Sequence, residues 1–376
     1  MRILFATTVL PAGRRSGGEV VSQAVVESLR DAGHDVVVLG YARPGDEVGV
    51  GEVCAGRRPI ETSSARMRSL AWAGAALLRR EPYTTAKYRS RSYRRLAREL
   101  AAEADVVIVD HAQASAAIGA VEKPLVAIAH NAEARLYAEL AESGRMRRVH
   151  AREARHIAAL EATLFNRARQ VWTLTPDDAG YARALSTRTQ VTVLEVPAGV
   201  RPVERAPEYD VALIGRWSWK PNARGLAWFC DRVLPHVPRG VEVHVAGAGA
   251  GGYAGVTLHG VVADAADFLS RARVVAVPAV AGSGVQVKTL DAIASGVPVV
   301  ATSHATRGLG DLPESVSVTD DPAAFARELQ RLAAERDRLR AAGLAWSEGR
   351  RRRFHETVED SIRELAPSGA DVAWSV

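Results

Sequence analysis

The chain has 376 residues, which is more than a single hydrophobic core normally serves and enough for two domains. A hydrophobic content of 47% is ordinary for a globular protein, and the two cysteines, Cys54 and Cys230, stand far apart, which argues against a disulfide framework or a zinc site. The net charge of +6 favours anionic partners such as nucleotide phosphates or anionic lipid, unless it reflects only a compositional preference for arginine.

Short runs rich in valine and isoleucine alternate with longer helical segments along the whole chain. In chain order, strands are expected at residues 2–6, 35–39, 105–109, 125–129, 170–174, 190–196, 211–214, 241–246, 256–258, 273–277 and 298–301. Runs with so little alternation are typical of strands that helices cover on both faces. The pattern therefore predicts an α/β fold with two doubly wound, Rossmann-like domains.

Proline, glycine and charged residues cluster at residues 197–207, which indicates a linker between these domains. We expect an N-terminal domain over residues 1–200, a C-terminal domain over residues 201–345 and a tail helix over residues 346–366. The first apolar run is too short for the core of a signal peptide or for a membrane span. With so few cysteines, this predicts a cytoplasmic protein.

Two segments, residues 87–95 and 350–353, are strongly basic. We interpret them first as solvated helix faces, and alternatively as places of peripheral contact with an anionic membrane or an anionic acceptor. Over residues 66–98 the arginines alternate with apolar and aromatic side chains, a pattern that suits a lipid-linked acceptor. Nucleic-acid binding is not expected, because no RNA-recognition, zinc-finger or helix-turn-helix pattern accompanies the charge.

Unusual residues cluster where the expected strands end, which is where open parallel sheets bind ligands. These residues are the loop with Gly17 and Gly18, the segment that starts at His130, the segment from Arg216 to Lys220, and the loop at residues 281–284. We therefore expect sites from both domains to converge on one cleft.

The most informative segment is a glycine-rich turn that leads into a helix of about ten residues, which Gly296 ends. The turn consists of Gly282, Ser283, Gly284 and Val285. Free amides and the positive end of the helix dipole suit a diphosphate there. Lys288 adds a positive charge one turn into the helix, and Asp291, on the same face, can accept hydrogen bonds from a ribose diol. The alternative is an ordinary strand–turn–helix unit with a surface lysine.

This segment resembles the donor-binding signature of the group-one, family-four retaining glycosyltransferases of the GT-B fold. Motifs similar to the same family stand in the expected order at residues 16–19, 33–36, 130–133, 196–200 and 219–222. The resemblance covers residues 1 to about 365. It implies an N-terminal domain that takes the acceptor, a C-terminal domain that binds the nucleotide sugar, and a tail helix that returns to the N-terminal domain.

The resemblance also implies roles for matching residues. Arg216, Lys220 and Lys288 would neutralise the donor diphosphate, together with the amides after Gly284. Asp291 would hold the ribose hydroxyls.

Further roles follow from the same resemblance. The backbone at Val261 and Val262 would read the base, and His130 would lie near the transferred sugar and the acceptor. Gly17 and Gly18 would let the backbone approach the phosphates or the sugar.

The chain departs from the family pattern at two positions. Ser283 stands eight residues before Asp291, where the family usually has a glutamate, and the Gly-Ser-Gly turn resembles a variant branch that binds with glycine amides and a lysine. Lys220 lies one residue nearer its glycine than the family's commoner lysine does.

Sugar transfer from a nucleotide diphosphate develops negative charge on the leaving phosphate, which fixed cations and amide dipoles can stabilise. The chain contains no Asp-x-Asp motif, so we expect a metal-independent transferase without a cofactor. The resemblance implies a retaining outcome, in which the leaving phosphate deprotonates the acceptor. The donor is expected to be a UDP- or GDP-linked hexose, and the acceptor a hydroxyl of a lipid-linked glycan, polysaccharide or small molecule.

Three other interpretations stay open beside this one. Residues 247–252 satisfy Gly-x-Gly-x-x-Gly, which would suit a dehydrogenase, but the acidic residue of a dinucleotide site is missing at the end of the next strand. A sugar-nucleotide epimerase and a non-catalytic partner of another transferase are the remaining alternatives. Trp217 and Trp219 are equally suited to pack in the wall of the cleft or to contact a ligand, whereas Trp228 is expected in the core.

Overall fold

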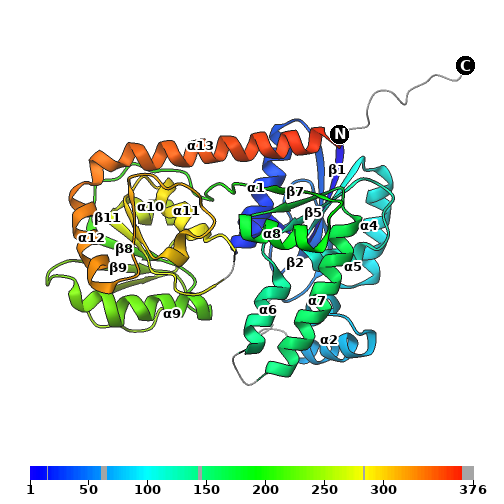
Figure 1. The fold of residues 1–376 in the computed structure, drawn as a ribbon, viewed down its shortest axis with the longest axis horizontal. Coiled ribbons are helices and arrows are strands. Elements are labelled where there is room, and N and C mark those ends of the chain that lie inside the picture. The colour runs from blue at the N-terminus through cyan, green and yellow to red at the C-terminus, as the bar shows by residue number, and fades with distance from the viewer. Residues whose placement is uncertain (15, 61–65, 143–145, 283, 366–376) are drawn as a thin grey trace, which may run out of the picture. The chain divides into compact units, whose positions relative to one another are not determined.

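The computed structural model describes residues 1–14, 16–60, 66–142, 146–282 and 284–365. The chain forms two compact units, each with its own parallel sheet (Figure 1). Unit 1 consists of Met1–Leu194 and the C-terminal segment from His355, and unit 2 consists of Glu195–Phe354. The predicted fold class, two doubly wound α/β sheets, is confirmed.

The sheet of unit 1 has the strand order β3-β2-β1-β4-β5-β6-β7, and all of its neighbouring strands are parallel. Its strands are β1 (Arg2–Val9), β2 (Asp35–Ala42), β3 (Glu52–Arg57), β4 (Val106–Asp110), β5 (Leu125–Ala129), β6 (Gln170–Thr173) and β7 (Gln190–Val193). The central strands β1 and β4 are buried on both faces, which explains their continuous apolar sequences.

Helices cover both faces of this sheet. They are α1 (Gly17–Asp31), α2 (Arg66–Arg79), α3 (Tyr83–Tyr88), α4 (Arg91–Glu103), α5 (Ala112–Ile118), α6 (Glu133–Glu142), α7 (Arg147–Arg167) and α8 (Pro176–Leu185). One face packs against α4, α5, α7 and α8 in a single hydrophobic cluster. Serine and threonine side chains accept hydrogen bonds from the first-turn amides of α1, α4 and α8, which fixes where these helices begin.

Unit 2 has the strand order β10-β9-β8-β11-β12-β13, also parallel throughout. Its strands are β8 (Tyr209–Ile214), β9 (Val243–Ala246), β10 (Thr257–Gly260), β11 (Ala272–Val277), β12 (Val299–Ala301) and β13 (Val316–Val318). The helices that cover it include α9 (Lys220–Trp228), α10 (Ala265–Ser270), α11 (Val287–Ala294), α12 (Pro322–Ala334) and α13 (Arg336–Arg363). Separate hydrophobic clusters lie on the two faces.

Helix α13 starts ten residues before the expected tail helix and belongs to unit 2 up to Phe354 and to unit 1 from His355. Its Gly343 lies so close to Ile293 that a Cβ atom would stand 3.2 Å from the backbone oxygen. The glycine in the middle of the helix therefore serves close packing. Within the described ranges, no helix is both long and apolar enough to cross a membrane.

The glycine-rich residues 247–252 form a turn after β9, and no helix begins in them. Gly247 has a φ of +117°, and a Cβ atom there would stand 1.8 Å from the oxygen of Gly215. Glycine is needed because two loops touch backbone to backbone. The dinucleotide interpretation of this segment therefore has no structural basis.

Candidate functional site

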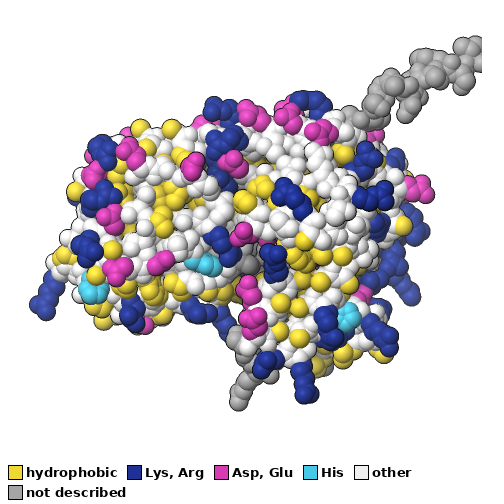
Figure 2. Space-filling view, viewed as in Figure 1, with side chains coloured by type: hydrophobic (Ala, Val, Ile, Leu, Met, Phe, Trp, Pro, Cys, Tyr) yellow, Lys and Arg dark blue, Asp and Glu magenta, His cyan; other side chains and the backbone are white. Residues whose placement is uncertain are grey.

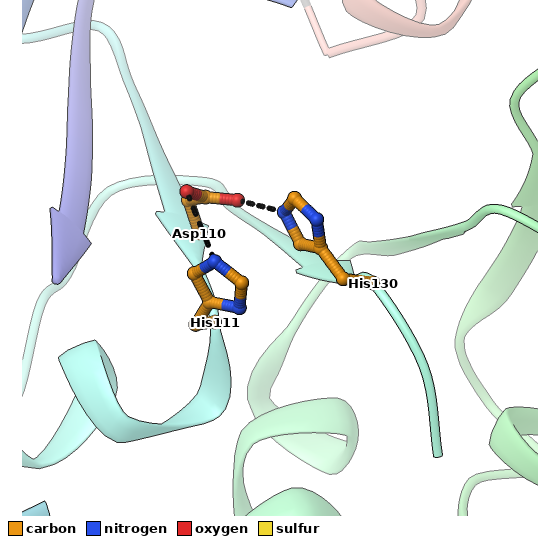
Figure 3. Close-up of side chains that lie close together, drawn as sticks. All are labelled: Asp110, His111 and His130. Carbon is orange, nitrogen blue, oxygen red and sulfur yellow. Dashed lines mark hydrogen bonds and ion pairs between the residues drawn. The ribbon is translucent and has the colours of Figure 1, made fainter. Parts of the chain in front are cut away.

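The carboxyl ends of β4 and β5 bring a buried aspartate and a histidine together (Figure 3). Asp110 is the last residue of β4 and is fully buried, and His130 directly follows β5. The Nε2 atom of His130 lies 2.6 Å from Oδ1 of Asp110. The sequence predicted His130 as a site residue but gave no role to its partner.

The other carboxylate oxygen of Asp110 accepts hydrogen bonds from the hydroxyls of Thr7 and Ser22, each at 2.7 Å. Burial alone would raise the pKa of Asp110, but the charges of His111 and His130 and the hydrogen bonds from His130 and Thr7 hold it well below its usual range. The group is therefore a carboxylate at neutral pH. It accepts a hydrogen bond from the N–H at Nε2 of His130, which leaves Nδ1 of that ring to face other groups.

His111 flanks this pair. Its backbone has a φ of +70°, an uncommon conformation for a residue with a side chain, and its ring stacks on that of His130 with a centroid distance of 4.0 Å. Burial, and then the neighbouring His130, lower the pKa of His111 to about 4, so its ring is neutral under physiological conditions. The strained turn thus supports the position of His130 with an uncharged ring.

The first turn of α1 lies directly against these two rings. A Cβ atom on Gly18 would stand 3.7 Å from Nε2 of His111 and 3.9 Å from Nδ1 of His130. Because α1 begins at Gly17, unpaired amides and the positive end of the helix are adjacent to His130. The structure therefore brings Gly17, Gly18 and His130, three of the predicted residues, into one place.

Asp110, His111 and His130 also have ligand atoms within 4.8 Å of one another, as a metal site would. Both oxygens of Asp110 already accept hydrogen bonds, however. The 2.6 Å between Nε2 and Oδ1 is also shorter than the roughly 3.3 Å between two ligands of one tetrahedral zinc ion. The arrangement fits a hydrogen-bonded His–Asp pair better than a metal-binding site.

Two carboxyl groups, those of the buried Glu161 and the half-buried Glu133, line a cavity together with His130. This cavity of about 10 Å³, enough for roughly one water, is lined by His111, His130, Glu133 and Glu161, among others. Glu161 accepts hydrogen bonds from the amide of Glu133 at 3.0 Å and from the hydroxyl of Tyr181 at 2.6 Å. Burial raises the pKa of Glu161 to about 7 and also raises that of Glu133. This polar cluster fixes the start of α6 beside His130.

In unit 2, the second residue of α11, Lys288, is held by the first turn of α9. The Nζ atom of Lys288 donates to Oδ1 of Asn222 at 2.8 Å, and the amide nitrogen of Asn222 donates to the backbone oxygen of Arg216 at 3.0 Å. Burial lowers the pKa of Lys288 to about 8, which still leaves it mostly charged at neutral pH. Asn222 therefore positions a cation beside the loop that carries Arg216, and sequence reasoning gave it no such role.

The glycine turn before α11 lies against the same first turn of α9. Gly282 and Gly284 have φ values of +124° and +68°, which favour glycine, and a Cβ on Gly282 would stand 3.8 Å from Cβ of Pro221. Ser283 lies outside the described residues, and Val285 precedes Gln286, which caps α11.

The remaining predicted residues of unit 2 occupy other positions near the carboxyl ends of its strands. Arg216 is exposed in the loop after β8, Lys220 is exposed as the first residue of α9, and Val261 and Val262 directly follow β10. Asp291 uses Oδ1 to accept from the amides of Gly199 and Val200, at 2.8 and 3.3 Å, and burial raises its pKa to about 6.

The structure separates the two tryptophans of this loop. Trp217 is buried, and its indole donates to the oxygen of Ala246 at 2.8 Å, whereas Trp219 is 58% exposed directly before α9. Trp228 packs edge-on against Phe325, as expected for the core. Of the three tryptophans, only Trp219 is exposed enough to solvent to contact a ligand.

The comparisons with known proteins agree with this arrangement. Residues 16–197 match the family described as the glycosyl transferase 4-like domain, and residues 208–335 match the glycosyl transferases of group 1. No curated protein that was compared is significantly similar to the chain in sequence.

Solved structures share the fold over nearly the whole chain. HepE of Anabaena, solved in complex with UDP, is 15% identical, with a TM-score of 0.63 over 97% of this chain and 99% of HepE. Sucrose-phosphate synthase of Thermosynechococcus elongatus is 16% identical, with a TM-score of 0.62 over 97% of this chain and 98% of that protein. WaaG, a glycosyltransferase involved in lipopolysaccharide biosynthesis, is 15% identical, with a TM-score of 0.59 over 98% and 100%.

At this identity the solved structures establish the fold, and the two family matches, which lie one after the other and together span most of the chain, establish the kind of enzyme. The chain belongs to the glycosyltransferases with the GT-B fold.

Proposed function

We propose that the protein transfers a hexose-type sugar from a nucleoside diphosphate to a hydroxyl acceptor, and that unit 2 binds the donor. The observation that carries this proposal is the cluster at the start of α11. There a half-buried lysine, Lys288, is oriented by Asn222 beside the loop of Arg216 and next to a glycine turn at a helix N-terminus. Cations and free amides in this arrangement suit a diphosphate.

UDP is the preferred donor nucleotide in this proposal, with GDP as the alternative. The fold neighbour HepE was solved with UDP and also with UDP-glucose, which supports a uridine donor. Asp291 would hold the ribose hydroxyls with its carboxylate, and the backbone of Val261 and Val262 would contact the base. The glycines of the turn would bring amides to the phosphates.

We further propose that transfer requires no metal ion and retains the configuration of the sugar. Lys288, Lys220 and Arg216 would neutralise the charge that develops on the leaving diphosphate. That phosphate would then take the proton of the acceptor hydroxyl. His130, held by Asp110, would contact the transferred sugar or the acceptor through Nδ1.

The acceptor class remains the broad one predicted from the sequence: a lipid-linked glycan, a polysaccharide or a small molecule. A cytoplasmic location, with peripheral contact at an anionic membrane, accompanies this proposal. A non-catalytic partner protein or a sugar-nucleotide epimerase is the alternative function. Either would bind a nucleotide without transferring a sugar.

A thermal-shift series against UDP, GDP, dTDP and NAD, with EDTA throughout, tests the donor proposal. We expect UDP to raise the melting temperature, and Lys288→Met to abolish that rise. Lys123→Met, an exposed lysine of unit 1, is the matched control and should keep it. Stabilisation by NAD alone, or by no nucleotide, would contradict the proposal. Release of UDP from a UDP-sugar only when an acceptor extract is added would then separate a transferase from a binding partner.

A further inference from the structure

Helix α2 presents an apolar face to solvent. Its residues 70–78 contain no charged side chain, yet Leu70, Leu77 and Leu78 are 70%, 64% and 88% exposed. These leucines share one side of the helix with Gly74, where an added Cβ would meet nothing within 4 Å. The opposite side is anchored by Ala76, which is buried. A helix with its apolar side turned outward needs a partner that covers it.

The end of α6 and the start of α7 add further exposed apolar side chains. Leu140, Met146 and Val149 are 41%, 56% and 52% exposed. Of the twelve large hydrophobic side chains that are exposed among the described residues, five therefore lie on α2, α6 and α7, and a sixth, Met146, directly precedes α7. Single exposed apolar side chains are common on protein surfaces. Here, however, half of these twelve are concentrated in one region, where they form an apolar surface.

Helix α7 joins these elements into one body. The guanidinium of Arg152 donates to the backbone oxygen of Ala76 in α2 at 2.9 Å, and Glu153 accepts from the amide of Tyr83 at 2.7 Å. The rings of Tyr137 in α6 and His150 in α7 also contact each other edge to face. The three helices lie at one end of unit 1 (Figure 1).

Positive charge surrounds the apolar side chains. The exposed arginines are Arg68, Arg79, Arg80, Arg147, Arg148 and Arg155. The exposed acidic side chains of α6 are Glu139 and Glu142, while Glu153 is buried against Arg152. Figure 2 shows hydrophobic side chains interspersed with Lys and Arg side chains over this end of unit 1. The net charge of the surface is positive.

We infer that α2, together with the exposed side chains Leu140, Met146 and Val149, is a docking surface for an anionic lipid bilayer. An interfacial helix lies in the plane of the membrane with its apolar side in the acyl boundary, and arginines at its ends reach the lipid phosphates. In α2 the exposed leucines lie between Arg68, near the start of the helix, and Arg79 at its end, which matches this pattern. A protein partner would more often offer aromatic anchors and few charges at the centre.

This inference rests on the peripheral membrane contact in the proposed function and does not depend on sugar transfer, although the surface would bring an enzyme to a lipid-linked acceptor. The test is flotation of the full chain with phosphatidylcholine vesicles, with and without phosphatidylglycerol, at low and high salt. We expect binding to the anionic vesicles at low salt. The double variant Leu77→Glu/Leu78→Glu should weaken binding at least about tenfold, since charges must then enter the acyl boundary. Arg68→Ser/Arg148→Ser should weaken it less and reduce its salt dependence.

Val50→Glu is the matched control, because Val50 is 93% exposed elsewhere on unit 1; this variant should bind as the unchanged protein does. No flotation at low salt, or equal flotation of the leucine variant, would overturn the inference. Light scattering that shows a dimer lost in the leucine variant would also overturn it, because a second copy would then cover the surface. The melting temperature of each variant without nucleotide reports folding, and its separate rise with UDP shows whether the donor proposal holds.

Discussion

Asp110 illustrates how a buried residue outside any motif can define a site. Its carboxylate orients His130 and is itself held by Thr7 and Ser22, from β1 and α1. The sequence offered one signal, an acidic residue at the end of a strand of valines and isoleucine next to a histidine. That signal names a position but not a partner, because the contact spans twenty residues and depends on the register of β4 and β5.

Asp110→Asn should change the tautomer of His130. The amide oxygen can still accept from Thr7 and Ser22, but its nitrogen then faces Nε2 of His130 and cannot accept a proton from it. His130 would carry its proton on Nδ1 instead. We expect transfer to fall at least about tenfold, equivalent to roughly 1.4 kcal/mol in the transition state. The NMR chemical shifts of the two ring nitrogens of His130 report which one carries the proton. An unchanged tautomer in the variant would contradict the prediction.

Lys288 should make nucleotide binding depend on pH. Burial lowers its pKa to about 8, and only the charged form attracts a diphosphate. The charged fraction falls about tenfold between pH 7 and pH 9, so UDP affinity should fall by about the same factor. Calorimetric titration at the two pH values measures this. Lys288→Met should bind weakly and lose most of the dependence; a wild-type affinity that stays constant would contradict the assignment.

Glu161 should make folding stability depend on pH in the opposite sense to a salt-bridged carboxylate. Burial raises its pKa from the ordinary 4.5 to about 7, so the folded chain holds a proton that the unfolded chain releases. Its contribution to stability is therefore lost as the pH rises from about 4.5 to about 7, at a cost of about 1–3 kcal/mol.

Glu161→Gln removes this titration and keeps a group that can pair with the Glu133 amide and the Tyr181 hydroxyl. Urea denaturation should find the variant as stable as the unchanged protein at pH 5 and more stable at pH 8. An equal difference at both pH values would mean that Glu161 does not titrate in this range.

At the scale of elements, apolar patterning predicted the central strands well because helices bury them on both faces. The edge strands β3 and β13 were not predicted. β3 begins and ends with a charged residue, and β13 has only three residues, two of them half-buried and one exposed. The tail helix was expected from residue 346 but α13 starts at Arg336, because a glycine within a packed helix, here Gly343, looks like a helix end in the sequence. Partners such as Asn222 and Lys288 could not be paired from sequence, since 66 residues separate them.

Gly247 gives a sharp test of the turn after β9. Gly247→Ala should destabilise unit 2 by about 2–4 kcal/mol, because the new Cβ would overlap the Gly215 oxygen and the backbone has a positive φ. Gly252→Ala lies in the same turn with nothing within 4 Å and should change stability by less than about 0.5 kcal/mol. Urea denaturation compares the two. Similar values for both would mean that the loops do not touch as described.

At the scale of the whole molecule, each unit has its own parallel sheet and its own hydrophobic clusters, while α13 runs from one into the other. Separate cores predict separate unfolding transitions. The proposed phosphate ligands Arg216, Lys220 and Lys288 all belong to unit 2. UDP should therefore raise the free energy of unfolding of unit 2, by about 2.7 kcal/mol when the UDP concentration is a hundred times the dissociation constant. The melting temperature of that transition should rise accordingly.

Differential scanning calorimetry, with the Gly247→Ala variant to identify the transition of unit 2, measures this effect. In Lys288→Met the UDP-dependent rise should disappear while both transitions remain. A single transition that UDP raises as a whole would show instead that the two units unfold together, with α13 as the continuous element that couples them. A rise confined to unit 1 would contradict the assignment of the donor to unit 2, because the nucleotide would then bind near the His130–Asp110 pair and not at Lys288.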